Sequence, residues 1–139
     1  MENEMIAWCA GFLDGEGSFL PWVWHREGRP PTFQCKITAN QVSHREPLDR
    51  LAQYLGGKVS LQPRYTGDRP LYEWSVTGGA QCKAALELIA PYISNKREVC
   101  ALLYEYLETF VGRSGVRLSD EIVAERIRLI EAMKVARRS

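Results

Sequence analysis

The sequence predicts an α+β protein, and three observations along the chain support this prediction. The segment from Met5 to Leu13 carries no charged residue, which is typical of a short helix buried on every side. Two pairs of strand-like segments follow, and a turn-rich stretch separates the members of each pair. Helical patterns fill the remaining length. The predicted order is therefore helix, hairpin, helix, hairpin and three further helices.

The first hairpin is predicted from a change of hydrophobic period. Bulky and aromatic side chains dominate residues 18–25, and Gly-Arg-Pro-Pro at 28–31 interrupts them. Residues 33–42 then alternate, with apolar side chains at 33, 35, 37 and 39 and polar ones between them. This alternation predicts a half-buried strand with one polar face. In the first strand, by contrast, Leu20, Trp22 and Trp24 share the outward phase of Arg26.

The other elements follow from helical spacing and from turn residues. A first helix is expected at about residues 4–15 and a second over 45–55, which Gly56-Gly57 ends. The second hairpin is predicted over 59–65 and 71–77, with a turn at 66–70. Helices are predicted over 80–90 and 95–110 and at about 119–137. The chain has no linker of low complexity, so we assign all 139 residues to one domain.

Composition restricts the possible function classes. No apolar run approaches the roughly 18 residues that cross a bilayer, and no signal-peptide pattern precedes Met5. The four cysteines are widely scattered and form no CxxC pair, which predicts buried free thiols instead of structural zinc. We therefore expect no membrane partner. The expected location is an intracellular, reducing compartment, such as a bacterial or phage cytoplasm or an organelle.

The distribution of charge is more informative than the net charge of +1. Residues 1–20 contain four acids and no Lys or Arg, whereas residues 21–75 contain eight bases against five acids. An acidic centre beside a basic surface suits a metal site next to a nucleic acid.

The segment from Cys9 to Gly17 joins the apolar helix to two carboxylates. Asp14 and Glu16 stand at the end of the helix, between glycines. A helix C-terminus carries partial negative charge, so carboxylates there are unfavourable unless a cation compensates them. The arrangement indicates a metal site. A glycine-rich helix-to-strand turn is the alternative.

The same nine residues resemble the LAGLIDADG signature of homing endonucleases. Ala10, Gly11, Asp14 and Gly17 agree with the name-giving pattern, and Glu16 keeps an oxygen ligand suited to Mg²⁺ at the second acid. The predicted order of elements also matches the αββαββα core of that family over roughly residues 5–111. The resemblance implies a four-stranded antiparallel saddle with helices on one face and extra C-terminal helices. The polar face of the saddle would lie in the DNA major groove.

The activity that the resemblance implies is a double-strand break at a long, near-palindromic DNA site, made by metal-dependent phosphodiester hydrolysis and used in intron homing. Mg²⁺, or another divalent cation such as Mn²⁺, is the implied cofactor, and no small-molecule cofactor is expected. The chain has one motif, and single-motif members are homodimers whose motif helices pack at the two-fold axis. The small residues Ala7, Ala10 and Gly11 suit such a contact.

The resemblance also assigns roles to individual positions. Glu16 would bind the metal beside the backbone carbonyl of Gly15. Lys96, which follows a Pro-aromatic-aliphatic run, would act near the scissile phosphate, although the arginine after it is a second candidate. Gln41 resembles the glutamine that orders active-site water. Asp14 is expected to end the helix, with direct metal ligation as the alternative.

The residues expected to contact DNA are those on the outward phase of the strands and in their turns. Arg and Lys suit guanine edges, Asn and Gln suit adenine, and Glu can accept from cytosine. They are Trp22, Trp24, Arg26, Arg29, Lys36, Thr38, Asn40, Gln62, Arg64, Arg69, Glu73 and Ser75.

Two other functions remain open from the sequence. A protein of the same fold could bind nucleic acid without cutting it, as an intron splicing factor or a transcription factor. A metal-free dimerisation domain would show no DNA affinity and no salt-dependent binding.

Overall fold

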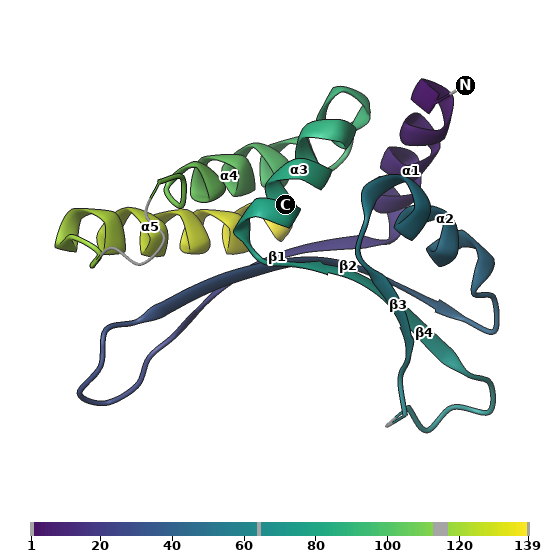
Figure 1. The fold of residues 1–139 in the computed structure, drawn as a ribbon, viewed down its shortest axis with the longest axis horizontal. Coiled ribbons are helices and arrows are strands. Elements are labelled where there is room, and N and C mark those ends of the chain that lie inside the picture. The colour runs from purple at the N-terminus through teal and green to yellow at the C-terminus, as the bar shows by residue number, and fades with distance from the viewer. Residues whose placement is uncertain (1, 64, 113–116, 139) are drawn as a thin grey trace.

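A curved antiparallel sheet forms one side of the molecule, and the helices lie together on the other side. This computed structural model describes residues 2–63, 65–112 and 117–138. Figure 1 shows the helices on the convex side of the sheet, while both hairpins curve away from them and leave the concave side without a helix. The strands are β1 (Gly17–Trp24), β2 (Thr32–Val42), β3 (Lys58–Leu61) and β4 (Leu71–Thr77), in the spatial order β1-β2-β4-β3.

The helices match the predicted order closely. Helix α1 runs directly into β1, and helix α5 crosses back over β1 near the C-terminus (Figure 1). No described helix is long and apolar enough to span a membrane. Their bounds are α1 (Glu2–Glu16), α2 (Glu46–Leu55), α3 (Gly79–Ile89), the 3₁₀ helix η1 (Ala90–Tyr92), α4 (Arg97–Glu108) and α5 (Asp120–Arg137).

The core lies between the convex face of the sheet and the helices. The predicted inward side chains of β2 at positions 33, 35, 37 and 39 are all buried, which confirms the alternation. In β4, Trp74 is fully buried and its indole N–H donates to the carbonyl oxygen of Gly56 at 2.9 Å. The four cysteines are buried free thiols, as predicted. Burial raises the pKa of Cys9 to about 11 and that of Cys100 to about 12, so both stay protonated at neutral pH.

Strand β1 has the phase that the sequence predicts. Phe19 and Pro21 are buried on the convex side, and the side chain of Val23 packs against the core. The alternate residues Leu20, Trp22 and Trp24 therefore lie on the concave side.

Several predicted boundaries differ from the structure by a few residues, and two of these differences have a clear physical reason. Strand β3 ends at Leu61 and not at residue 65, because Pro63 has no N–H to donate to a ladder. Helix α4 begins at Arg97 and not at residue 95, because the backbone N–H groups of residues 94–96 donate to a side chain of α1.

Helix α5 is held by a buried cation. Arg126 is 4% exposed and donates to the hydroxyl and the carbonyl oxygen of Thr109, at 2.8 and 3.0 Å. Its guanidinium also lies 3.9 Å from the ring centroid of Phe110 and 5.1 Å from that of Phe33. These contacts attach α5 to the end of α4 and to β2.

Candidate functional site

The two motif carboxylates lie where α1 passes into β1 without a loop. Glu16 is the last residue of the helix, and Gly17 is the first residue of the strand. A Cβ atom at position 17 would lie 2.7 Å from the carbonyl oxygen of Leu13, which is too close for any side chain. Glycine at this position therefore allows the strand to leave the helix directly.

Asp14 caps the N-terminus of α4. Its carboxylate accepts hydrogen bonds from the backbone N–H groups of Ser94, Asn95 and Lys96 at 3.1, 2.9 and 2.8 Å. Partial burial raises the pKa of Asp14, but the three backbone hydrogen bonds and the nearby Lys96 charge lower it, and the pKa falls below its usual value. This geometry agrees with the supporting role that the sequence favours.

Lys96 makes the reciprocal contact from α4 back to the motif. Its ammonium group donates to the carbonyl oxygens of Leu13 and Gly17, at 3.2 and 2.6 Å. A positive charge is favourable at a helix C-terminus, which carries partial negative charge. Lys96 is only partly exposed, so it is not a freely solvated surface lysine. The structure therefore brings Lys96 and the motif together.

Glu16 differs from Asp14 in having no partner. Its side chain is exposed, and it makes no hydrogen bond or ion pair with any described residue. The backbone of Gly15 beside it is also exposed. A carboxylate and a carbonyl oxygen are the hard donors that Mg²⁺ prefers, and Mg²⁺ usually takes one or two carboxylates together with substrate phosphates and water. No three Asp, Glu, His or Cys side chains gather into a metal cage within the described ranges. The donor set therefore suits a metal site that substrate helps to complete.

The end of β2 contains two amides, and alternation separates them. Asn40 is exposed on the concave phase, whereas Gln41 shares the phase of buried Ala39 and faces the helices. Since Gly17 pairs with Ala39, Asn40 is the residue next to Glu16 across the strand pair. Asn40, and not the predicted catalytic Gln41, therefore lies on the concave phase opposite the end of α1.

Most predicted DNA contacts share the concave face or its turns. Thr38 has the concave phase but is only 4% exposed, with Ser18 and Ser75 beside it on the two neighbouring strands. It therefore presents almost no surface to a ligand, which argues against this predicted contact. Arg64 lies outside the described residues. On the concave phase or in its turns are Trp22, Trp24, Arg26, Arg29, Lys36, Asn40, Gln62, Arg69, Glu73 and Ser75.

Sequence reasoning missed two concave residues of β3. Lys58 pairs with Ser75 and Ser60 pairs with Glu73, so both side chains lie on the concave phase. The ammonium of Lys58 adds a positive charge to this face. A strand start one residue earlier, directly after the double glycine, would have revealed Lys58, whereas Ser60 already shares the phase of the predicted contact Gln62.

Part of the predicted dimer contact of α1 is open on the surface of the chain. Gly11 and Gly15 are exposed, Ala7 is half-buried, and a Cβ atom added at either glycine would touch nothing. Ala10, however, is fully buried in the core of its own chain, so it is not available to a second molecule. The open stripe of α1 consists of Ala7, Gly11 and Gly15.

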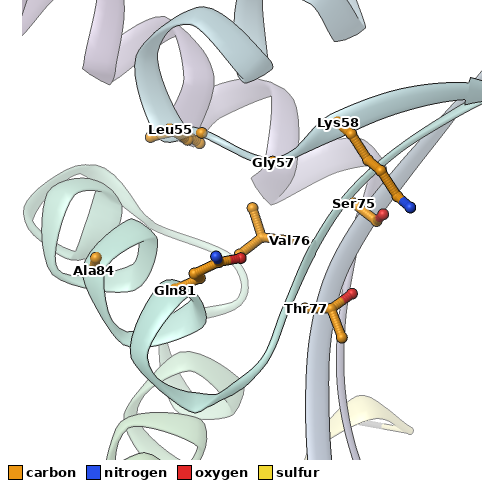
Figure 2. A pocket seen from close by; sticks show the side chains of 9 residues that line it. Leu55, Gly57, Lys58, Ser75, Val76, Thr77, Gln81 and Ala84 are labelled. Atoms are coloured by element: carbon orange, nitrogen blue, oxygen red, sulfur yellow. The ribbon is translucent and has the colours of Figure 1, made fainter.

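A separate hollow of about 700 Å³ lies between the end of α2, strands β3 and β4, and the start of α3 (Figure 2). Figure 2 shows Lys58 at its rim, with Val76 and Gln81 inside. Among the described residues, Lys58 is the one ionisable side chain in its lining, and the motif residues lie elsewhere.

Comparison with known proteins identifies the same architecture. The DNA endonuclease I-CvuI of Chlorella vulgaris is 24% identical over 129 residues, which is 90% of this chain and 78% of that protein. The crystal structure of I-CvuI with its target matches with a TM-score of 0.81 at 22% identity, over 97% of this chain and 83% of that one. The chain has the LAGLIDADG homing endonuclease fold.

Two further structures support this assignment. The archaeal intron-encoded homing endonuclease I-Vdi141I in complex with DNA matches with a TM-score of 0.82 at 16% identity, over 98% of this chain and 86% of that one. The I-SmaMI LAGLIDADG homing endonuclease bound to cleaved DNA matches with a TM-score of 0.78 at 20% identity, over 95% of this chain but 44% of that one. No family model matches the chain. The resemblance stated from the motif is confirmed.

Proposed function

We propose that this protein is a site-specific DNA endonuclease of the homing type. The observation that supports it best is Glu16, an exposed carboxylate with no partner among the described residues, at the edge of a concave sheet face on which no described helix lies. The I-CvuI relative is a DNA endonuclease, and its structure was solved with target DNA and 2 mM Ca. The concave face is the surface that would enter the major groove of duplex DNA.

Glu16 and the carbonyl of Gly15 are the groups proposed to hold a divalent cation, with Mg²⁺ or Mn²⁺ as candidates. A bound divalent cation activates water for attack on a phosphodiester and neutralises charge on the leaving oxygen. Glu16 is suited to this because no internal contact neutralises its charge, whereas Asp14 is engaged by three backbone donors.

Lys96 is proposed to act on the scissile phosphate while it holds the end of α1. Its ammonium group is fixed by two carbonyl oxygens one residue and three residues away from Glu16. A cation that is already positioned stabilises developing charge without reorganisation. Asn40, on the same side as Glu16, replaces Gln41 as our candidate for the residue that orders water.

We propose that the active form is a homodimer with paired α1 helices. A single chain offers one free motif carboxylate, but a double-strand break needs one active site for each strand. The stripe of Ala7, Gly11 and Gly15 lets two helices approach closely, and a two-fold axis there predicts a near-palindromic target. The chain covers 44% of I-SmaMI, which leaves room in that protein for a second unit of this size.

The test is cleavage of a pool of duplex DNA with randomised sites in the presence of Mg²⁺. We expect discrete double-strand breaks in sites with two-fold symmetry, and no cleavage by Glu16→Gln, which keeps the shape of the side chain. Binding of the selected site by Glu16→Gln should remain, since the substitution leaves the concave face intact. Tight binding without any cleavage by the wild type would instead support a splicing or transcription factor, and the absence of DNA binding would refute both functions.

A further inference from the structure

The concave phase of β1 is apolar from position 20 to position 24, unlike that of the three other strands. Leu20, Trp22 and Trp24 occupy it, and none of them belongs to the hydrophobic core or packs against it. Trp24 is 55% exposed. A contiguous apolar strip on an otherwise polar surface marks a contact site. We call these three residues the β1 strip.

Cations and polar groups surround the β1 strip. Lys36 of β2 lies opposite Leu20, and the guanidinium of Arg26 lies 4.2 Å from the ring centroid of Trp24. The concave face and its turns together carry five bases against three acids in the described part of the chain. The bases are Arg26, Arg29, Lys36, Lys58 and Arg69, and the acids are Glu27, Asp68 and Glu73. The partner must therefore offer apolar groups within a negatively charged surface.

Duplex DNA meets both requirements at one position. In the major groove the C5-methyl group of thymine is the apolar group that side chains contact, and it lies between two phosphate backbones. The β1 strip continues the face already proposed to enter the groove. We propose that Leu20, Trp22 and Trp24 read thymine methyl groups in each half-site, an inference that rests on the proposed function.

The strand geometry gives the approximate place of these thymines. Glu16 marks the cleavage point, and a strand rises about 3.3 Å per residue, so Leu20 to Trp24 lie about 13 to 26 Å from Glu16 along β1. At about 3.4 Å per base pair, this corresponds to roughly four to eight base pairs from the cut. Two-fold symmetry repeats the positions on both sides.

Single-stranded RNA is the competing partner, because exposed tryptophans can also stack on bases. One face of the Trp24 ring is already covered by Arg26, which reduces the surface available for stacking. This partial covering of the ring favours a groove contact.

The experiment uses two randomised duplex pools, one with thymine and one with deoxyuridine in its place. Uracil keeps the O4 acceptor and lacks only the methyl group. We expect thymine enrichment four to eight base pairs from the cut in the first pool and its loss in the second. The proposal is overturned if the enrichment persists in the uracil pool. It is also overturned if the thymine pool shows no thymine enrichment four to eight base pairs from the cut. If neither pool is cut, the endonuclease function fails, and sequencing of the bound fraction of both pools still decides the thymine inference.

Variants assign the effect to the strip. On the selected site, each uracil at a contacted position should weaken binding about fourfold, because one buried methyl group is lost. Trp24→Gln, at an exposed position, should abolish this difference for the outermost position, whereas Lys36→Gln should weaken binding but preserve the difference. A Trp24→Gln variant that keeps the thymine preference overturns the proposal. Preferential binding of single-stranded RNA that Trp24→Gln abolishes would also overturn it, in favour of stacking.

Discussion

Replacement of Asp14 by Asn tests whether the two motif acids have separate roles. The carboxylate of Asp14 accepts three backbone hydrogen bonds from residues 94–96. Asparagine offers one carbonyl oxygen and turns its NH₂ group toward at least one of these donors. Hydrogen bonds to a charged group contribute about 1.5–3 kcal/mol each and neutral ones about 0.5–1.5 kcal/mol. The carboxylate also interacts with the N-terminus of α4, which contributes about 0.3–1 kcal/mol.

The expected loss of stability is at the low end of these values, because two of the three hydrogen bonds are exposed to water. We expect Asp14→Asn to lower the free energy of unfolding by about 2 kcal/mol. With a urea dependence of about 2 kcal/mol per molar, the unfolding midpoint falls by about 1 M. The measurement is urea unfolding at pH 7, followed by circular dichroism.

The pH dependence provides a second readout of the same contact. The pKa of Asp14 lies below its usual value in the folded protein, so as the pH falls the unfolded chain takes up the proton first. The stabilisation is therefore present above the ordinary Asp pKa of about 3.9 and is lost as the pH falls through the lower, folded-state value. We expect the difference between wild type and Asp14→Asn to be constant near pH 7 and to shrink in acid.

Glu16→Gln is the matched control, because this exposed side chain has no partner among the described residues. It should leave the urea midpoint unchanged and abolish cleavage. The reasoning is refuted if Asp14→Asn unfolds at the wild-type urea concentration. If that stable variant also fails to cleave, Asp14 is a metal ligand and not a cap.

Three other predictions follow from the packing. Lys96→Met should slow single-turnover cleavage by orders of magnitude with a modest change in Kd. It should also lower the free energy of unfolding by about 1–2 kcal/mol, because two carbonyl oxygens lose a charged donor. An unchanged cleavage rate on bound DNA would remove Lys96 from the active site. Gly17→Ala should destabilise the fold by about 1–3 kcal/mol, because its Cβ atom would clash with the backbone. Gly11→Ala should stabilise an isolated chain by about 0.5–1 kcal/mol and weaken self-association, as measured by light scattering. Equal effects at the two glycines would contradict this. Arg126→Met should lower the free energy of unfolding in urea by about 2–3 kcal/mol, since Thr109 loses two hydrogen bonds. A variant with wild-type stability would show that α5 is held in another way.

Much of the fold was predictable because period and turn residues act locally. The alternation of β2 fixes which face is buried, and the phase of Leu20, Trp22 and Trp24 was correctly extended into β1 despite its apolar outer face. The end of β3 was not predicted, because the effect of Pro63, which has no N–H, depends on whether the partner strand needs a donor at that position.

The errors in the candidate site have a common cause, because the burial of these residues depends on neighbours that are distant in sequence. Thr38 is on the predicted face but is only 4% exposed on β2, the strand between β1 and β4. Ala10 is small and helical, like Gly11, but it faces its own core and not a second chain. The sequence pattern of α1 cannot distinguish these two directions, because the helix is apolar all round.

Reciprocal contacts between α1 and α4 fix the arrangement of the motif residues. Asp14 on α1 satisfies the N-terminal N–H groups of α4, and Lys96 at the start of α4 satisfies C-terminal carbonyls of α1. Each charge lies at the helix end whose dipole it complements, so both contacts are favourable without placing the two side chains in a direct ion pair. As a result, the backbone on both sides of Glu16 is fixed by residues about 80 positions away. Glu16 can therefore lack contacts with the other described residues and still be held in place, as its proposed role in binding a metal requires.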